Sequence, residues 1–326
     1  MRRILAAFVM GAWTAITASS CAFAQTKDYP VRTLRFIVPW PAGGIADVRS
    51  RLIGDRLAKA MGQAVVVDNR PGADGTIGAY TVAGAQPDGY TILLGSNIDQ
   101  AIALAVHRDL PYRPLRDLIP VIVWGKSHLV LVANPNVPAR DIKEFLAWMK
   151  NSRDPPAYSS GGNAHAAHLA GVMLQDRLGV ELLHIPYKGA APALTAVISG
   201  DVSFGFDYVA TSLPMIEASK LRPLVVMGPK RLRLLPNVPS VDEAGLANMY
   251  AYTWGGFFVP KGTPPAVMTR LNFEIGKILS SLDVSGHVAF SGVEFDIRSG
   301  DDLTEFIRNE QMKWGNLVKA ADVKAE

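Results

Sequence analysis

Residues 34–47 read Leu-Arg-Phe-Ile-Val-Pro-Trp-Pro-Ala-Gly-Gly-Ile-Ala-Asp. The apolar run from Leu34 to Val38 is typical of a buried strand. From Asp47 to Met61 the apolar residues recur close to helical spacing, and Gly62 is a suitable end for that helix. The stretch therefore predicts a strand, a tight glycine turn and a helix, which is the repeating unit of α/β proteins.

The same order of short strands and helices recurs to the end of the chain, which indicates α/β layering throughout. Further strands are predicted at 64–68, 90–94, 129–133, 157–159, 182–185, 202–206, 224–227 and 254–259, and further helices at 139–150, 191–198, 212–218, 265–281 and 303–321. We expect two α/β lobes joined by a hinge. Residues 25–125 with 250–326 would form a discontinuous first lobe, and residues 126–249 the second.

The first 24 residues have the features of a cleavable signal peptide. Arg2 and Arg3 precede an apolar stretch from Ile4 to Thr17, and Ala22-Phe23-Ala24 fits an A-x-A cleavage site. The alternative is a membrane anchor, but about 20 apolar residues are needed to span a bilayer and polar residues interrupt this stretch. We expect the segment to be removed on export, and with it Cys21, the single cysteine of the chain.

The charge of the chain argues against nucleic acid as a partner. The formal net charge is +4, two of these charges are Arg2 and Arg3, and no run of five like charges occurs. No apolar run of membrane length follows the signal peptide, so we expect a soluble protein of nearly balanced charge. A chain of about 300 residues can be stabilised by core burial without disulfides.

The turn after the first strand has the features of an anion site. Glycines let the backbone turn sharply, and the unpaired N–H groups and dipole of a helix N-terminus attract a carboxylate or phosphate. Amides from Ala42, Gly43, Gly44, Ile45 and Ala46 are candidate donors, with Trp40 and Ile45 as an apolar wall. The alternative is a purely structural turn in which Asp47 caps the helix.

A second turn of this kind lies between the strand at 157–159 and the next helix. Its candidate ligand-binding residues are Ser160, Gly161, Gly162, Asn163, Ala164 and His165. Because ligands of open α/β sheets collect at the carboxyl ends of strands, Ser96 and Asn97 after a third strand and Asp207 after a fourth are also candidates. Two lobes facing one another could present both turns to a single anion.

Motifs for enzymes and cofactors are missing from the sequence. It contains neither G-x-x-x-x-G-K-[ST] nor G-x-G-x-x-G, and neither H-E-x-x-H nor the G-x-S-x-G elbow of hydrolases. His165 and His168 lie three residues apart, but no cysteine is available to complete a zinc site. We therefore expect no metal, no cofactor and no catalysis, with a periplasmic hydrolase as the least favoured alternative.

Several ordered blocks of sequence from Tyr29 onward resemble one family. They are Val38-Pro39-Trp40-Pro41-Ala42-Gly43-Gly44 with Asp47, Asp68-Asn69-Arg70-Pro71-Gly72-Ala73, Pro87-Asp88-Gly89-Tyr90-Thr91, Leu94-Gly95-Ser96, His168-Leu169-Ala170-Gly171, Pro186-Tyr187-Lys188-Gly189, Ala191-Pro192-Ala193-Leu194, Phe206-Asp207 and Val241-Asp242-Glu243-Ala244-Gly245. Together they resemble the tripartite tricarboxylate transporter substrate-binding proteins, also called Bug receptors.

The resemblance implies a type II-like periplasmic binding protein, a monomer with a ligand cleft between two α/β lobes. Such a receptor holds a ligand carboxylate through main-chain N–H groups of the two turns, partly by bridging water, and delivers it unchanged to the membrane permease subunits of the transporter. The resemblance also brings Tyr187 into the expected site. A periplasmic sensor that passes its ligand to a signalling partner needs the same cleft and is the principal alternative.

This chain departs from the family pattern inside both turns. Ile45 and Ala46 make the first turn more apolar, Ala164 replaces a hydroxyl in the second, and His165 is added. Tyr208 follows Asp207 where asparagine is common in the family. These changes favour a less hydroxylated ligand among the di- and tricarboxylates, such as an aromatic or a simple dicarboxylate, although Ile45 and the alanines could serve only to pack the helices.

Overall fold

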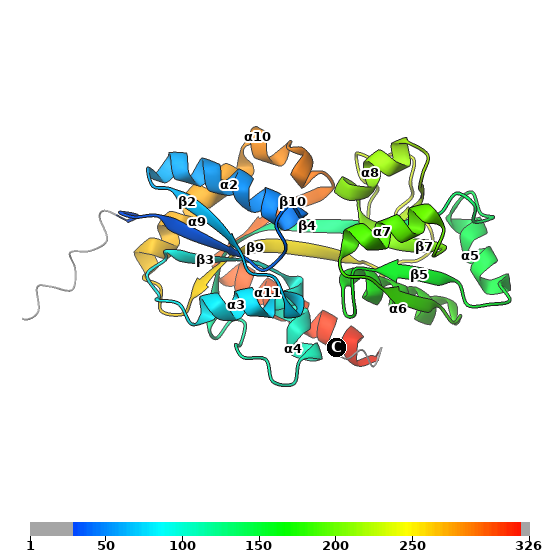
Figure 1. Ribbon diagram of the computed structural model, residues 1–326, viewed down its shortest axis with the longest axis horizontal. Coiled ribbons are helices and arrows are strands. Elements are labelled where there is room, and N and C mark those ends of the chain that lie inside the picture. The colour runs from blue at the N-terminus through cyan, green and yellow to red at the C-terminus, as the bar shows by residue number, and fades with distance from the viewer. Residues whose placement is uncertain (1–28, 321–326) are drawn as a thin grey trace, which may run out of the picture.

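The computed structural model describes residues 29–320. The predicted signal peptide lies outside these described residues. The long axis of the molecule is horizontal in Figure 1, and two long strands, β4 (Leu118–Ala133) and β9 (Tyr252–Pro260), run along its middle. Most side chains of both strands are buried, as expected for strands that are covered on both faces.

The first sheet has the strand order β2-β1-β3-β9-β4. Strand β1 (Leu34–Val38) is parallel to both β2 (Val65–Asn69) and β3 (Thr91–Ser96), whereas β9 is antiparallel to both β3 and β4. Strand β10 (Val293–Arg298) is antiparallel to the middle of β4, residues 123–127. The turn that follows β1 therefore lies at the carboxyl edge of a parallel group of strands.

The second sheet begins in the second half of β4 and continues in the order β4-β7-β5-β6. Strand β5 (Ala157–Ser160) is parallel to β6 (Leu183–Pro186) and β7 (Phe204–Tyr208). Strand β8 (Arg222–Val226) is antiparallel to β4. Because β4 pairs within both sheets, it connects the two halves of the molecule directly.

Helices cover both sheets (Figure 1). They are α2 (Ile45–Met61), η1 (Ala73–Gly75), α3 (Thr76–Ala83), η2 (Ile98–Ile102), α4 (Ala103–Val106), α5 (Ile142–Asn151), α6 (Ala166–Leu178), α7 (Ala190–Ser199), α8 (Val209–Glu217), α9 (Pro265–Ser280), α10 (Leu282–Ser285), η3 (Val288–Phe290) and α11 (Gly300–Ala320).

Close packing against the sheets holds helices α2 and α6, which begin at the site, in place. Side chains of α2 and α9 share one buried cluster with Phe36, Trp124 and Phe257 of the first sheet. In the second sheet, α6 lies so close to β5 that a Cβ at Gly171 would overlap the ring of Tyr158. The N-termini of α2 and α6 are therefore held rigidly at the ends of β1 and β5.

The predicted strands and longer helices are present, with ends that differ by a few residues. The main difference is β4, because residues 118–128, which the sequence did not predict as a strand, continue into the predicted segment 129–133. Its register shifts beside Pro120 and near Gly125, where φ is +133°, and these irregularities hide the strand pattern. The short η2–α4 segment and β10 were not predicted.

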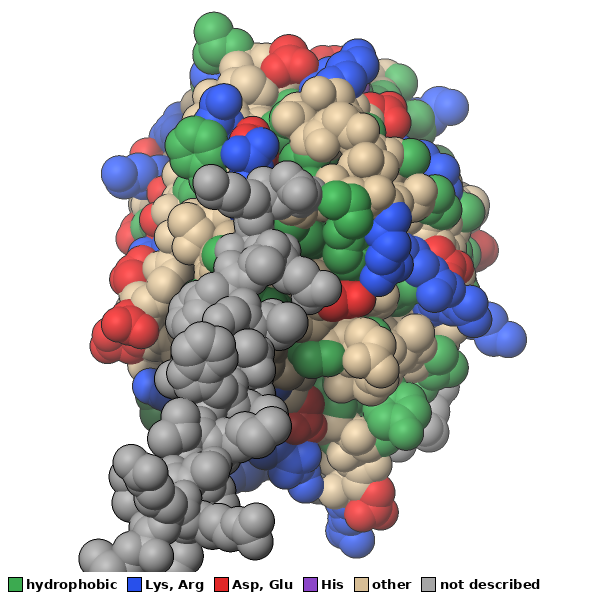
Figure 2. All heavy atoms as spheres, turned by 90° about the vertical axis from the view of Figure 1, so that its left-hand side faces the viewer, with side chains coloured by type: hydrophobic (Ala, Val, Ile, Leu, Met, Phe, Trp, Pro, Cys, Tyr) green, Lys and Arg blue, Asp and Glu red, His purple; other side chains and the backbone are tan. Residues whose placement is uncertain are grey.

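The surface at the end of the molecule formed by the first sheet is shown in Figure 2. Lys and Arg side chains are interspersed with Asp and Glu side chains over much of this face. Within residues 29–320, no helix has both the length and the apolar character needed to cross a membrane.

Candidate ligand-binding site

The first glycine-rich turn joins β1 to the N-terminus of α2. Gly43 has a φ of +81° and donates its N–H to Asp47 Oδ2 at 2.9 Å, while Gly44 donates to the carbonyl of Pro41 at 3.4 Å. Arg51 lowers the pKa of Asp47, so this acceptor is a carboxylate. Two of the predicted donors are thus used inside the turn.

The donors that remain in this turn belong to the first residues of α2. Gly44 is the N-cap, and the first bond of the helix runs from the N–H of Val48 to the Gly44 carbonyl. Ile45, Ala46 and Asp47 therefore have N–H groups without an intrahelical acceptor, and none of them bonds to another residue in the described part of the chain. These amides carry the positive end of the helix dipole.

The second turn joins β5 to α6 and is tied together by side chains. Ser160 is buried, and its Oγ accepts the N–H of Gly162 at 3.2 Å and lies 2.6 Å from Nε2 of His184. The N–H of Ala164, whose φ is +58°, donates to Nδ1 of His168 at 3.0 Å. Gly162 and Ala164 thus use their amides within the turn, and the first-turn amides of α6 remain.

A pair of neutral histidines supports this second turn. The rings of His168 and His184 stack at 3.8 Å with an interplanar angle of 6°. Burial lowers the pKa of each ring to about 4, and for His168 the neighbouring His184 adds to the effect. An unprotonated Nδ1 is required to accept the Ala164 N–H, so His168 holds the turn rather than facing the ligand.

The two turns meet. The ring of Trp40, which follows β1, lies edge-on to the ring of His165, the N-cap of α6, with 6.1 Å between the ring centroids. Burial lowers the pKa of His165, although Asp74 opposes this effect, so the ring is neutral at pH 7. The amide-bearing N-termini of α2 and α6 therefore lie on the two sides of this aromatic contact.

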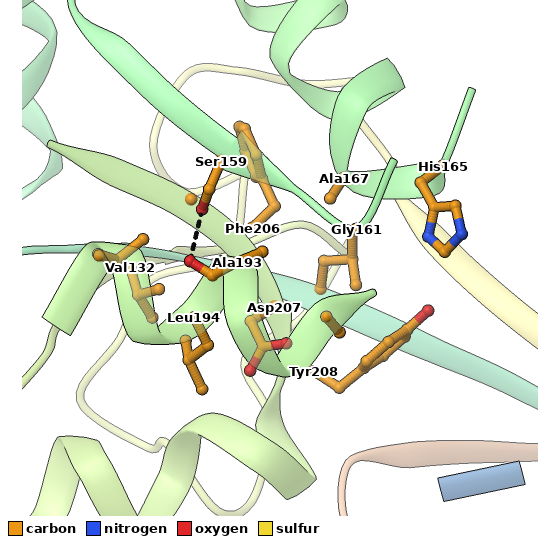
Figure 3. A pocket seen from close by; sticks show the side chains of 14 residues that line it. Val132, Ser159, Gly161, His165, Ala167, Ala193, Leu194, Phe206, Asp207 and Tyr208 are labelled. Atoms are coloured by element: carbon orange, nitrogen blue, oxygen red, sulfur yellow. Dashed lines mark hydrogen bonds between the residues drawn. The ribbon is translucent and has the colours of Figure 1, made fainter. Parts of the chain in front are cut away.

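A small pocket, partly open to solvent, lies beside the second turn (Figure 3). Gly161, His165 and Asp207, three of the predicted residues, line it. Most of its remaining wall is apolar and comes from β4, β7, α6 and α7. These apolar residues include Leu129, Val132, Ala167, Ala190, Ala193, Leu194, Val197 and Phe206.

Asp207 contributes the carboxyl group of the cavity wall. Its side chain is 5% exposed, and Oδ2 accepts a hydrogen bond from Thr211 Oγ1 at 2.6 Å. Burial raises the pKa of this carboxyl to about 7, against the opposing effect of Thr211. Ser159, by contrast, turns its hydroxyl to the carbonyl of Ala193, which Figure 3 shows as a dashed line.

The other predicted residues lie outside the lining of this cavity, among them all those of the first turn, from Trp40 to Ala46. Ser96, Asn97 and Tyr187 are bonded elsewhere. Ser96 Oγ donates to Asp99, and Asn97 is fully buried with its Nδ2 donating to the carbonyl of Tyr252. Tyr187 is half-buried, and its N–H donates to the carbonyl of Ser160. Asn97 therefore stabilises the first sheet, and Tyr187 aligns the second turn.

Sequence reasoning did not place Tyr208 and Leu194 in the site, yet both line the cavity. Tyr208 directly follows Asp207 at the end of β7, so its position at a strand end was a usable signal. Leu194 had no such signal, because an apolar residue on a helix indicates core packing. In residues 29–320 no cluster of three or more His, Cys, Asp or Glu side chains could hold a metal ion.

Comparison with known proteins identifies the family of this chain. The sequence model described as the receptor of the tripartite tricarboxylate transporter family matches residues 49–323. The chain belongs to this family. The predicted resemblance is therefore confirmed.

Three solved structures are similar to this receptor over nearly its whole length. Rpa4515 of R. palustris, solved with adipate, has a TM-score of 0.84 and 31% identity, covering 91% of this chain and 99% of that chain. The periplasmic binding protein BugD has a TM-score of 0.80 and 31% identity, with coverages of 91% and 100%. MatC (Rpa3494) of Rhodopseudomonas palustris, with bound malate, has a TM-score of 0.76 and 29% identity, with coverages of 89% and 100%. The predicted periplasmic binding protein fold is confirmed.

Proposed function

We propose that this receptor binds a small dicarboxylate between its two glycine-rich turns and delivers it, chemically unchanged, to the permease of a tripartite tricarboxylate-type transporter. The observation that carries the proposal is the meeting of the N-termini of α2 and α6 at the Trp40–His165 contact. Two helix N-termini aimed at one region provide unpaired N–H donors and two positive dipole ends, which suit a carboxylate.

The cavity supports the choice of ligand class. Its wall is apolar apart from Asp207, Tyr208, His165 and Ser159, so it suits a hydrocarbon chain or ring that is attached to the carboxylate. Relatives of this fold hold adipate and malate, which are both dicarboxylates. The scarcity of free hydroxyl groups in the two turns favours a ligand without many hydroxyls of its own.

We assign the binding residues by what each could offer the ligand. Ile45, Ala46 and the first residues of α6 would donate main-chain N–H groups, and Trp40 and His165 would form the aromatic wall. Ala42, Gly43, Gly44 and the turn from Ser160 to Ala164 would shape the two loops. Asp207 and Tyr208 would contact the far end of the ligand.

The division of the chain and its export belong to the same proposal. We place the first lobe at residues 25–125 and 250–326 and the second at 126–249, which agrees with the change of pairing partners along β4 near Ser127 and Leu129. Export with removal of residues 1–24 would bring a monomeric receptor to the periplasm, where the relative BugD is found.

Thermal unfolding with a panel of acids tests the proposed function. The panel contains adipate, malate, citrate and phthalate, each beside its amide. At 100 times its dissociation constant a ligand adds about 2.7 kcal/mol to native stability, which raises the Tm by roughly 5–11 °C. We expect at least one acid to do so and no amide. Equal stabilisation by an acid and its amide, or an amide recovered as its acid after incubation, would contradict the proposal.

A further inference from the structure

Arg49, on the second turn of α2, is a buried cation. Its side chain is 8% exposed, and its Nε donates to the carbonyl of Ala289 at 2.8 Å. The guanidinium lies over the ring of Phe290, 4.9 Å from its centroid, and 5.8 Å from that of Trp124. This is a confined and largely desolvated position for a permanent charge.

The charge of Arg49 has no counter-charge within residues 29–320. No carboxylate there forms an ion pair with it, whereas Arg51 pairs with Asp47 and Arg56 with Asp283 on the same helix. A guanidinium has five N–H donors, and only the Nε donor of Arg49 has an acceptor among these residues. Burial of an unpaired charge is costly, so an anion that completes this site would be bound favourably.

A second donor beside Arg49 also lacks an acceptor. The indole N–H of Trp124, whose ring lies against the guanidinium, is buried without a hydrogen-bond partner in the described chain. The local surplus is therefore of hydrogen-bond donors, which suits an anion better than a cation.

Arg49 lies one helical turn from the unpaired amides at the start of α2. Side chains of a helix lean toward its N-terminus, and residues four apart lie on one face. Arg49 therefore lies on the same face as Ile45, whose amide is one of the unpaired donors of α2. Tyr208, which lines the cavity, is close enough for its hydroxyl to interact electrostatically with the Arg49 charge.

We propose that Arg49 binds a second carboxylate of the ligand beside Tyr208, so that the receptor selects dicarboxylates over monocarboxylates. This inference rests on the proposed function, in which the first carboxylate lies at the amides of α2 and α6. Four residues of helix rise about 6 Å, so the two anion positions lie within reach of the two ends of an unbranched diacid. The planar guanidinium matches a carboxylate with two parallel hydrogen bonds.

Calorimetric titration with adipate and hexanoate tests this selection, because the two acids share a six-carbon chain and differ by one carboxylate. We expect the wild type to bind adipate at least about tenfold more tightly, which is the scale of one charged hydrogen bond. Arg49→Gln should erase the preference and leave the affinity for hexanoate within about twofold. Arg56→Gln, the same change at a partly exposed arginine of α2 that is already paired with Asp283, should keep the wild-type preference.

A preference for adipate that survives in Arg49→Gln would overturn the inference, and so would an equal loss of affinity for both acids, which a merely structural arginine would produce. Arg49→Lys keeps the positive charge but loses the two parallel donors of the guanidinium, so we expect a reduced preference for adipate over hexanoate. If Arg49→Gln does not fold, Arg49→Lys replaces it in the test. A preference equal to that of the wild type in Arg49→Lys would then overturn the inference. If the wild type binds adipate and hexanoate equally, the selection of dicarboxylates by Arg49 is refuted, but the proposed function is not. A wild type that binds no acid of the wider panel refutes the proposed function itself.

Discussion

At the residue scale, we expect the carboxyl of Asp207 to make ligand binding in the cavity depend on pH. Burial raises its pKa to about 7, so close to neutral pH this carboxyl is divided between its neutral and charged forms. A bound dianion would favour the neutral form, which can donate a hydrogen bond and does not repel the ligand. The nearby His165, His168 and His184 have pKa values below their ordinary range, so they do not titrate above pH 7.

We therefore predict that the affinity for a dicarboxylate falls as pH rises. The bound anion raises the pKa of Asp207 further, so binding is accompanied by proton uptake once the free carboxyl ionises. The affinity should change little between about pH 6 and 6.5, where the ligand is still a dianion, and fall by up to tenfold per unit between pH 7 and 8.5. Calorimetry at several pH values measures this dependence. Asp207→Asn should flatten the profile, whereas Asn at the exposed Asp201 should not change it.

Some residues of the site could be predicted from the sequence, and others could not. Gly161, His165 and Asp207 could be found because each lies at or just after a strand end, where sequence and chemistry point to the same place. Arg49 could not be found, since a charge within an amphipathic helix ordinarily indicates a solvated face. Its burial depends on η3 and Trp124, which lie far from it in the sequence.

At the scale of elements, the two helix N-termini carry the recognition of the first carboxylate. The N-cap residues Gly44 and His165 have ψ angles of 167° and 153°, so each already has the extended conformation that a following proline requires. Proline is tolerated at the first position of a helix, where it removes one N–H that the helix itself does not use.

Ile45→Pro and Ala166→Pro should therefore remove single donors without unfolding the protein. We predict that each weakens binding of the acid by about tenfold or more, because a hydrogen bond to a charged group is lost. Ile45→Ala and Ala166→Ser keep the amides and serve as matched controls that should bind almost normally. Titration of all four variants with the same acid measures the difference; unchanged affinity in both proline variants would rule out recognition by main-chain amides.

The elements themselves were predictable where their signals are local. The β1–turn–α2 unit has a periodic pattern, a glycine turn and a terminating glycine within thirty residues, and the structure reproduces it closely. Strand β4 was only partly predicted, because burial on both faces removes the alternation of apolar and polar residues. Strand β10, with its half-exposed and charged pattern, is defined by its pairing with β4.

At the scale of the whole molecule, the sequence patterns predict two α/β units. They do not predict that the glycine-rich turns of the two units contact each other. The meeting of Trp40 and His165 depends on β4, which pairs in both sheets, and on β9 beside it. These contacts join segments more than a hundred residues apart. The resemblance to a receptor family supplied this arrangement as an expectation, and the fold of the described chain agrees with it.

The central claim is that a ligand carboxylate is held between the first turns of α2 and α6. A crystal structure of the protein with the acid that raises the Tm most tests it directly. We predict a carboxylate oxygen within about 2.7–3.2 Å of main-chain nitrogens at the start of both helices, or joined to them by one water. A ligand bound elsewhere, or one whose carboxylate contacts neither helix, would contradict the account.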